Sequence, residues 1–389
     1  MTDLLRQEIA TSVKTLVVKV GTTVLTCQDG TLDQKQIARL AEELHRLIKS
    51  GRQVVLVSSG AVGAGMRQLG LHQRPTDLAK LQAVAAVGQA KLIEVYDRTL
   101  RKHGRHAAQV LLTADDLNDR TRYLNVRNTI LALLQYGAVP IINENDTVSV
   151  DELITAGAND QTTTTFGDND HLAALVTNLI RAPLLIILSN VDGLYDGDPS
   201  DPASKLVSTV THVDESVLAY VRDSATGLSK GGMASKLAAA RIAAMAGENV
   251  IIAGGRNDDV LARIIEGQPL GTLILAHGKS ISPRKRWIGF SAQPRGRVIL
   301  DAGARRAIEE RGSSLLAIGI VEAEGDFDKG DVVSLCDTAG HEFARGLSNY
   351  PADEIQRIKG LQTDRIAQVL GHCRYDEVVH RDNMTTLGR

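Results

Sequence analysis

Between about residues 15 and 276, short Val/Ile/Leu-rich runs alternate with longer amphipathic stretches. This pattern is typical of strand–helix repeats around a mostly parallel sheet, and the continuous hydrophobicity of the runs predicts strands buried on both faces. The candidate strands are TLVVKV (15–20), QVVLVSS (53–59), AAQVLLT (107–113), AVPIIN (138–143), PLLIILS (183–189) and NVIIAGG (249–255).

The stretches between these runs have helical periodicity. In 33–50, apolar residues from Ile37 to Ile48 recur at i, i+3, i+4 and i+7, and Gly51 follows as a helix end. Helices are likewise predicted over 79–103, 121–136, 170–181, 234–247 and 258–266. Only 12 residues are aromatic, so the core must be aliphatic. The predicted fold is an open, mostly parallel α/β sheet sandwiched by helices.

The pattern of residues in the sequence changes after Ala276. Residues 277–296 carry two prolines, a basic cluster and the single Trp, which indicates a linker. Short strand-like pieces follow, with brief helices near 302–311 and 352–359, and they predict a small β-rich domain. The expected organisation is a domain over 1–280, a linker over 281–295 and a second domain over 296–389.

Charge, cysteine content and termini exclude several classes of protein. The formal charge is −2, which gives no overall reason to bind nucleic acid or acidic membranes. The first residues lack the basic and apolar regions of a secretory signal, and no segment has enough consecutive apolar residues to span a bilayer. The three cysteines form no C-x-x-C pair that would indicate zinc or redox chemistry. We therefore expect a cytoplasmic protein with no membrane partner.

Lys19 lies within the apolar run TLVVKV. A lysine there is costly unless its ammonium emerges at the strand end to meet an anion, and Gly21 with Thr22 and Thr23 supplies such a turn. The alternative is a lysine that merely reaches solvent at the strand tip.

Residues 58–66 read SSGAVGAGM, a glycine-rich turn between a strand and an expected helix. Small residues here would let a phosphate or substrate approach backbone N–H groups. The spacing is not the dinucleotide fingerprint, so close helix–strand packing is an equal alternative.

Two clusters of acids and amides occur at NEND (143–146) and GDND (167–170). The first follows a buried strand, and the carboxyl edge of an open α/β sheet is where ligands bind. Asp can hold an ammonium group while Asn holds a carboxylate, so the pair suits a zwitterion. Helix capping and turn formation are the alternative.

The segment GLSKGGMASK (227–236) resembles a phosphate-binding loop, but Met233 stands where that motif needs lysine. A Gly-Gly turn between Lys230 and Lys236 at the start of a helix still makes a polyphosphate cradle. A flexible surface loop is the alternative.

The Asp/Gly-rich loop 188–199 lacks the order of a calcium loop and is interpreted as lying beside a nucleotide base. No G-x-S-x-G or H-E-x-x-H occurs, so hydrolase functions have no motif support.

Taken in order, these motifs resemble the amino acid kinase family. They are VVKVGTTVLT, VVLVSSGAVGAG, AAVGQ, QVLLT, VPIINENDTV, FGDND, GLY and GLSKGGMASK. Within that family the set resembles the enzymes that phosphorylate glutamate, and the tail, with GRVILDAGARRAIEERGSSLLAIGI, FDKGDVV and VVHRDNM, resembles a PUA domain. The resemblance covers nearly the whole chain.

This resemblance implies ATP-dependent phosphorylation of the γ-carboxylate of L-glutamate, the first step of proline synthesis, with Mg²⁺, inhibition by proline and assembly as a homodimer or homotetramer. It implies that Lys19 and Lys236 bind the ATP phosphates and that Asp170 orients those lysines. Glutamate would be bound by Ser59, Asp146 and Asn169, with Asn143 and Asp168 nearby. Nucleotide contacts would come from Lys19, Ser189, Asn190, Lys230, Gly231, Gly232, Met233, Ala234, Ser235 and Lys236. No metal site made by protein side chains alone is expected.

Two features depart from the family pattern. Position 190 is Asn where the family commonly has Asp, and residues 149–166 are longer than usual beside the expected glutamate site.

Two alternatives stay open. One keeps the family but changes the substrate to acetylglutamate, aspartate or carbamate; the NEND/GDND pair and the tail favour glutamate. The other is RNA binding through the tail. Residues 297–389 hold 12 Lys and Arg against 16 Asp and Glu, a net charge of −4, which argues against RNA.

Overall fold

The computed structural model describes residues 3–27, 31–148, 169–222, 230–277 and 282–387. The chain forms two compact units, Met1–Leu117 with Thr121–Lys279 and Asn118–Arg120 with Ser280–Arg389. Each unit has its own sheet and its own hydrophobic core.

The first unit is built on an eight-stranded sheet in the order β3-β4-β2-β1-β5-β7-β8-β6. All neighbouring strands are parallel except β7 and β8. This confirms the predicted open, mostly parallel sheet. Its strands are β1 (Thr15–Val20), β2 (Gln53–Ser58), β3 (Ala107–Leu112), β4 (Val139–Glu144), β5 (Leu184–Ser189), β6 (Thr209–Val210), β7 (Asn249–Gly254) and β8 (Thr272–Ile274).

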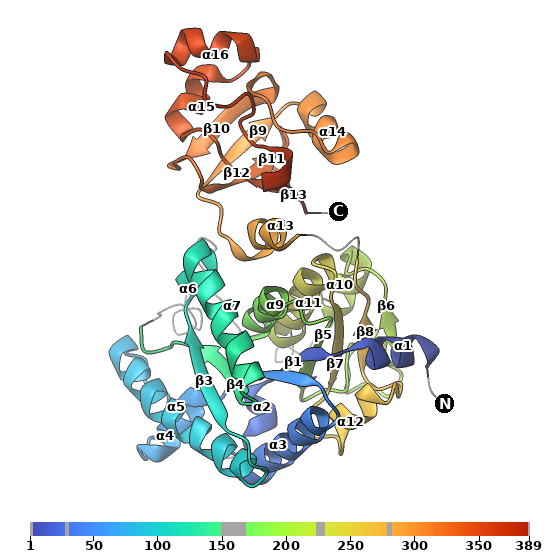
Figure 1. The fold of residues 1–389 in the computed structure, drawn as a ribbon. Helices are drawn as coiled ribbons and strands as arrows, with labels where there is room; N and C mark the ends of the chain where they lie inside the picture. Colours follow the sequence, from blue (N-terminus) through green and yellow to red (C-terminus); the bar gives the residue numbers. More distant parts are fainter. Residues whose placement is uncertain (1–2, 28–30, 149–168, 223–229, 278–281, 388–389) are drawn as a thin grey trace. The chain divides into compact units, whose positions relative to one another are not determined.

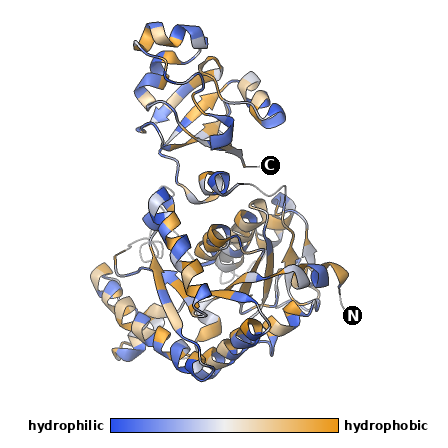
Figure 2. Cartoon of the chain, in the orientation of Figure 1, coloured by the Kyte–Doolittle hydropathy of each residue, from blue (hydrophilic) through white to orange (hydrophobic). Residues whose placement is uncertain are grey.

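Helices cover both faces of this sheet (Figure 1). α3 and α5 pack against one face, and α9 and α11 lie on the other. The strands are coloured mostly as hydrophobic, and the helices around them carry both hydrophobic and hydrophilic residues (Figure 2). The helices are α1 (Leu4–Ser12), α2 (Thr22–Leu25), α3 (Gln34–Lys49), α4 (Ala61–Gln68), α5 (Leu78–Arg101), α6 (Ala114–Asn118), α7 (Arg120–Gln135), α9 (Asn169–Ile180), α10 (Glu215–Arg222), α11 (Lys230–Met245) and α12 (Val260–Ile265).

Alternation along β1 sorts its side chains between the two faces. Leu16, Val18 and Val20 enter the core cluster that includes residues of α3, α5 and α12. Because side chains alternate in a strand, Lys19 points to the opposite face, where α9 begins. Every residue of β1 after Thr15 is buried, so Lys19 is a charged group inside an otherwise apolar strand.

The prediction of burial on both faces is wrong for β3. In β3 only Leu112 is buried, Gln109 is exposed and the other residues are half-exposed, whereas β4 and β5 are buried throughout. The reason is its place at the edge of the sheet, where β4 is its only paired strand among the described residues.

Residues 58–66 do not form the predicted turn over most of their length. Gly60 adopts φ +106 at the N-cap, and α4 begins at Ala61. A Cβ on Gly65 would lie 1.8 Å from the carbonyl oxygen of Val84 in α5. Gly65 therefore serves close packing of two helices, which corrects the interpretation that it faces a phosphate.

The second unit contains a five-stranded sheet in the order β10-β9-β11-β12-β13, with β9 and β11 parallel and the other pairs antiparallel. Its strands are β9 (Gly296–Leu300), β10 (Ile320–Gly325), β11 (Val332–Cys336), β12 (Glu342–Leu347) and β13 (Met384–Thr386). Its helices are α13 (Pro283–Arg286), α14 (Ala302–Arg311), α15 (Ala352–Ile358) and α16 (Thr363–Leu370). Short helical turns occur at Trp287–Ser291, Ala317–Gly319 and Arg381–Asn383.

Part of the segment predicted as a linker is ordered against this second sheet. The turn Trp287–Ser291 packs on β12 and β13. Arg345 of β12 donates hydrogen bonds to the carbonyl oxygens of Gly289 and Ala292 at 3.3 Å. By these contacts, residues 287–292 belong to the second unit.

Candidate active site

Two lysines share one buried carboxylate at the centre of the first unit. Lys19 of β1 places Nζ 2.6 Å from Oδ1 of Asp170, and Lys236 of α11 places Nζ 3.0 Å from Oδ2 of the same residue. Asp170 lies in the first turn of α9 and is completely buried. Lys236 also donates to the carbonyl of Gly232 at 3.1 Å.

Among the described side chains, this cluster combines two ammonium groups with one carboxylate. Burying ions is costly, and an excess positive charge in a buried site is suited to an anionic ligand. Lys19 pairs with Asp170 at the end of β1 and also lines a cavity, and its predicted contact with phosphates stays a prediction.

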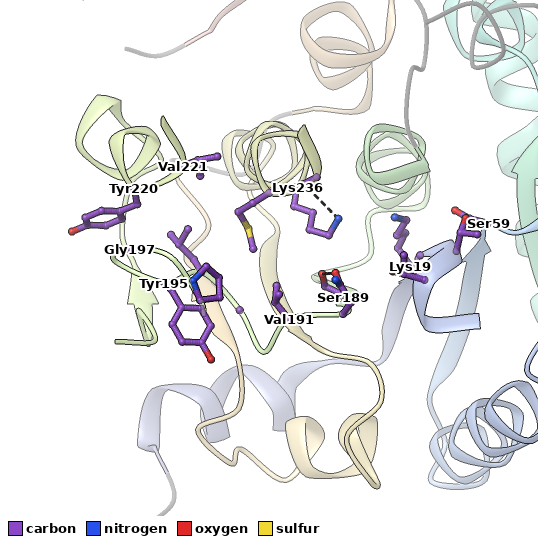
Figure 3. A pocket seen from close by; sticks show the side chains of 18 residues that line it. Lys19, Ser59, Ser189, Val191, Tyr195, Gly197, Tyr220, Val221 and Lys236 are labelled. Carbon is purple, nitrogen blue, oxygen red and sulfur yellow. Dashed lines mark hydrogen bonds between the residues drawn. The ribbon is translucent and has the colours of Figure 1, made fainter. Parts of the chain in front are cut away.

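The cavity has a volume of about 370 Å³ and lies across the ends of β1 and β5. β1 lies between β2 and β5, where the order of the strands reverses, the usual ligand site in an open α/β sheet. Lys19 and Ser59 lie at one end of the cavity, and Tyr195 and Tyr220 lie at the other, with Lys236 between them (Figure 3).

The two ends differ in chemistry. The end away from Lys19 is lined by Tyr195, Tyr220 and Val221 (Figure 3), and the apolar side chains of Val191 and Leu194 also line the cavity. The cavity therefore joins a cationic end to an apolar end, which suits a molecule with a flat apolar part and an anionic part.

A buried amide network borders the cationic end. Asn169 Nδ2 donates to Ser59 Oγ at 2.8 Å and to Asn143 Oδ1 at 2.9 Å. The acceptor role of Asn143 fixes which way the Asn169 amide points. The Oδ1 atom of Asn169 is buried and has no hydrogen-bond partner among the described residues, which marks it as an acceptor open to a ligand.

Asp146 lies in the same region, just beyond β4, and is 4% exposed. Ser59 lines the cavity and also accepts from Asn169, so it connects the nucleotide-sized cavity to the amide and carboxylate cluster. The structure thus brings together Lys19, Lys236, Asp170, Ser59, Asn143 and Asn169. Asp168 and residues 149–166 lie outside the described residues.

The predicted contacts from 189–190 and 230–236 are placed as follows. Ser189 and Asn190 line the cavity, and Ser189 Oγ donates to Asn190 Oδ1 at 3.3 Å. α11 begins at Lys230, so the Gly-Gly pair lies in its first turn rather than in a turn before it. Gly232 and Met233 line the cavity, Ser235 Oγ donates to Asp170 at 3.4 Å, and Ala234 is exposed and does not line it. The side chain of Lys230 and the environment of Gly231 lie outside the described part of the chain.

Comparison with known proteins matches both units. The model of the amino acid kinase family matches residues 14–254, and that of the PUA domain matches residues 296–370. The chain belongs to the amino acid kinase family. A glutamate 5-kinase of Rhodopirellula baltica is 49% identical over 380 residues, covering 98% of this chain and 95% of its own. A glutamate 5-kinase of Thermoanaerobacter sp. is 44% identical over 375 residues, covering 96% and 98%.

One solved structure, carbamate kinase from Giardia lamblia bound to AMP-PNP, has a TM-score of 0.47 and 18% identity and covers 68% of this chain and 99% of its own.

In this amino acid kinase, the described residues hold no group of three or more His, Cys, Asp or Glu side chains that could bind a metal ion. Both oxygens of Asp170 already face a lysine. Mg²⁺ prefers carboxylates together with substrate phosphates, so these residues do not fit a magnesium site made by the protein alone.

Sequence reasoning missed several residues that line this kinase's cavity. Tyr220 lies on α10, for which no helix was predicted, and Val221 follows it. Tyr195 lies within the loop 188–199 that was expected beside a base and in the quoted motif GLY, although it was not named as a site residue. Aromatic and aliphatic residues carry no distinctive pattern when they line a ligand site rather than a core.

Proposed function

We propose that this kinase transfers the γ-phosphoryl group of ATP to the γ-carboxylate of L-glutamate, the first step of proline biosynthesis. The observation that carries the proposal is the Lys19–Asp170–Lys236 cluster, which stands between a nucleotide-sized cavity and a buried network of amides and a carboxylate. Near full-length identity of 44–49% to glutamate 5-kinases supports glutamate as the acceptor.

Phosphoryl transfer to a carboxylate requires that the two reactants be positioned and does not require a general base. A carboxylate is already an anionic nucleophile at neutral pH, so no proton has to be removed. Two anions must instead be brought in line against their mutual repulsion, and charge on the transferring group must be stabilised.

In this proposal Lys19 and Lys236 hold the phosphates from opposite sides, and Asp170 keeps both ammonium groups aimed at one point. Asp170 does not contact the transferred group, because both of its oxygens face the lysines. The adenine lies between the apolar residues of loop 188–199 and α10, and Ser189, Asn190 and the start of α11 contact the nucleotide.

Glutamate would be held by its charged ends. Asp146 binds the ammonium group, and the open Oδ1 of Asn169 accepts a second N–H from it. Ser59, Asn143 and Asp168 complete the site in this proposal. The nucleotide enters as its magnesium complex, with the ion held by the phosphates.

Further properties follow from family resemblance and belong to the proposal. They are feedback inhibition by proline, assembly as a dimer or tetramer, a catalytic domain over 1–280 and a PUA-like domain over 296–389. A cytoplasmic location is supported by Cys27, Cys336 and Cys373 being unbonded thiols. No helix in the described ranges is long and apolar enough to cross a membrane.

A panel of acceptors tests the assignment. ADP release is measured with glutamate, N-acetylglutamate, aspartate and carbamate, each with and without proline. We expect ADP release with glutamate alone and a reduced rate when proline is added. Release with N-acetylglutamate in preference to glutamate would contradict the acceptor, because acetylation removes the ammonium assigned to Asp146.

A further inference from the structure

Helix α5 is held at backbone contact with the loop that carries Ser59. A Cβ on Gly88 of α5 would lie 1.7 Å from the carbonyl oxygen of Ala61, the first residue of α4. Ser59 and Gly60 immediately precede α4. The position of α5 and the position of the Ser59 loop are therefore fixed together.

The side chains beside this contact reach toward the proposed glutamate site. Gln89 and Tyr96 are seven residues apart and so lie on one face of α5, and both are buried. Tyr96 OH lies 3.1 Å from Ser58 Oγ, and Ser58 Oγ donates to the carbonyl of Ser59 at 3.3 Å. Because the single proton of Ser58 is used there, Tyr96 is the donor to Ser58. Burial raises the pKa of Tyr96, so the hydroxyl keeps its proton.

The Gln89 amide meets the end of β4. Its Nε2 donates to the carbonyl of Glu144 at 3.4 Å and to Asp146 Oδ2 at 3.5 Å. Its Oε1 accepts from Nε2 of Gln109 on β3 at 3.1 Å. A reversed amide would face Asp146 and Glu144 with an oxygen and Gln109 with a nitrogen, so the three partners specify one orientation.

We propose that Gln89 is a positioning residue that holds the Asp146 carboxylate in place for the ammonium group of glutamate, with Gln109 fixing the orientation of Gln89. This role rests on the proposed function. A neutral amide suits the task, because it supplies a hydrogen bond to a buried carboxylate without neutralising its charge. The full negative charge then remains for the ammonium group, whereas a lysine or arginine at position 89 would compete with it.

The test compares three variants with the wild-type enzyme. Gln89→Met keeps the length of the side chain and loses its hydrogen bonds. Gln89→Glu keeps the acceptor for Gln109 but brings a second carboxylate to Asp146. Gln109→Met removes only the contact that orients Gln89. Gln82→Met, which makes the same change two turns away on α5, is the matched control.

We expect the KM for glutamate to rise about tenfold in Gln89→Met, since a hydrogen bond to a charged group is lost. In Gln89→Glu the KM for glutamate rises further, because two carboxylates repel each other. In Gln109→Met it rises by only about threefold, because Gln109 contacts Gln89 and not Asp146. The KM for ATP and kcat stay within about twofold in all three, and Gln82→Met matches the wild type.

Glutarate separates a specific role from general damage, because it has both carboxylates of glutamate and no ammonium group. Its inhibition constant against glutamate should be unchanged in Gln89→Met. An equal loss for glutarate and glutamate, or a parallel change in the KM for ATP and the melting temperature, would overturn the positioning role.

An unchanged KM for glutamate in Gln89→Met would also overturn the positioning role of Gln89. If Gln89→Met does not fold, an unchanged KM for glutamate in Gln109→Met would overturn it. Absence of glutamate-dependent ADP release in the wild type would instead overturn the proposed function and this role with it.

Discussion

Asp170 shows how one residue organises a site assembled from three distant parts of the chain. Its two oxygens pair with Lys19 of β1 and Lys236 of α11, 151 and 66 residues away. Without this carboxylate, two ammonium groups would repel each other at short range in a low-dielectric site. With it, both are held toward the cavity before any ligand arrives.

Lys236→Ala should lower kcat by about 10² or more, because a preorganised positive charge is lost from the transferring phosphoryl group. The Lys236 side chain is 12% exposed and lies on an outer helix, so the fold should survive. Steady-state ADP release measures the effect, and Lys19→Ala should act in the same direction. Lys49→Ala, which removes an exposed lysine of α3 that does not line the cavity, is the control. Near-normal turnover in purified Lys236→Ala would contradict the assignment.

A histidine pair away from the site predicts how stability depends on pH. His45 stacks on His103 with ring centroids 4.1 Å apart, and His103 pairs with Glu42. Partial burial, followed by the nearby charges of His103 and Arg105, lowers the pKa of His45. His45 therefore binds a proton more readily in the unfolded chain around pH 6, and its contribution to stability falls as pH falls below about 6.5.

The drop in melting temperature from pH 7.5 to pH 5.5 should be smaller in His45→Gln than in the wild type. His72→Gln, at an exposed position, should leave the drop unchanged. A His45→Gln profile as steep as the wild-type profile would show that His45 does not carry the effect.

At the scale of single residues, part of the site could be predicted from the sequence. Lys19 stands out as a charge within an apolar strand, and the amides of 143–146 follow a buried run. The resemblance also assigned Asp170 to the lysines and included Gln89 in the motif AAVGQ, but nothing in the sequence pairs Gln89 with Asp146 or Tyr96 with Ser58. Their hydrogen bonds depend on which helix packs beside which strand end.

At the scale of elements, the strand and helix positions of the first unit follow from hydrophobic periodicity. The six predicted strands match β1, β2, β3, β4, β5 and β7 to within one residue at each end. The sequence showed no clear pattern for α1, β6 and β8, because these segments are too short for a hydrophobic periodicity to be recognised. α4 was missed because three glycines in nine residues are typical of a turn, and the contact with α5 explains Gly65.

That contact predicts a large effect of a small change. Gly88→Ala places a methyl group 1.7 Å from a backbone oxygen, so α4 and α5 must separate. We expect a loss of about 3 kcal/mol or more in the free energy of unfolding, despite the higher helix propensity of alanine. Urea denaturation measures it.

Gly303→Ala on the exposed helix α14 makes the same substitution where the only near neighbour is a side-chain oxygen at 3.2 Å. It should change stability by less than about 1 kcal/mol. Equal effects of the two substitutions would show that the glycine contact does not hold the helices together.

At the scale of the whole molecule, each unit can be considered separately. Every residue that lines the cavity lies between positions 19 and 236, within the first unit. The second unit is built around its own apolar cluster, which includes Val298, Leu335, Phe343 and Ile355. The change of residue pattern after Ala276 predicts a domain boundary near residue 280, but it did not indicate that residues 287–292 pack on the second sheet.

A chain ending at His277 should therefore bind ATP with a dissociation constant within about threefold of that of the full chain. Isothermal titration with a non-hydrolysable ATP analogue measures this. A loss of binding in a truncated chain that is folded by circular dichroism would show that the second unit takes part in the nucleotide site.

The central claim is that the lysine pair on Asp170 moves a phosphoryl group from ATP to the side-chain carboxylate of glutamate. The most direct measurement traps the product with hydroxylamine and identifies it by mass spectrometry. We predict γ-glutamyl hydroxamate from glutamate and ATP in the wild type, and at least about a hundredfold less in Asp170→Asn. ADP formation without any hydroxamate, or undiminished hydroxamate in a folded Asp170→Asn, would contradict the claim.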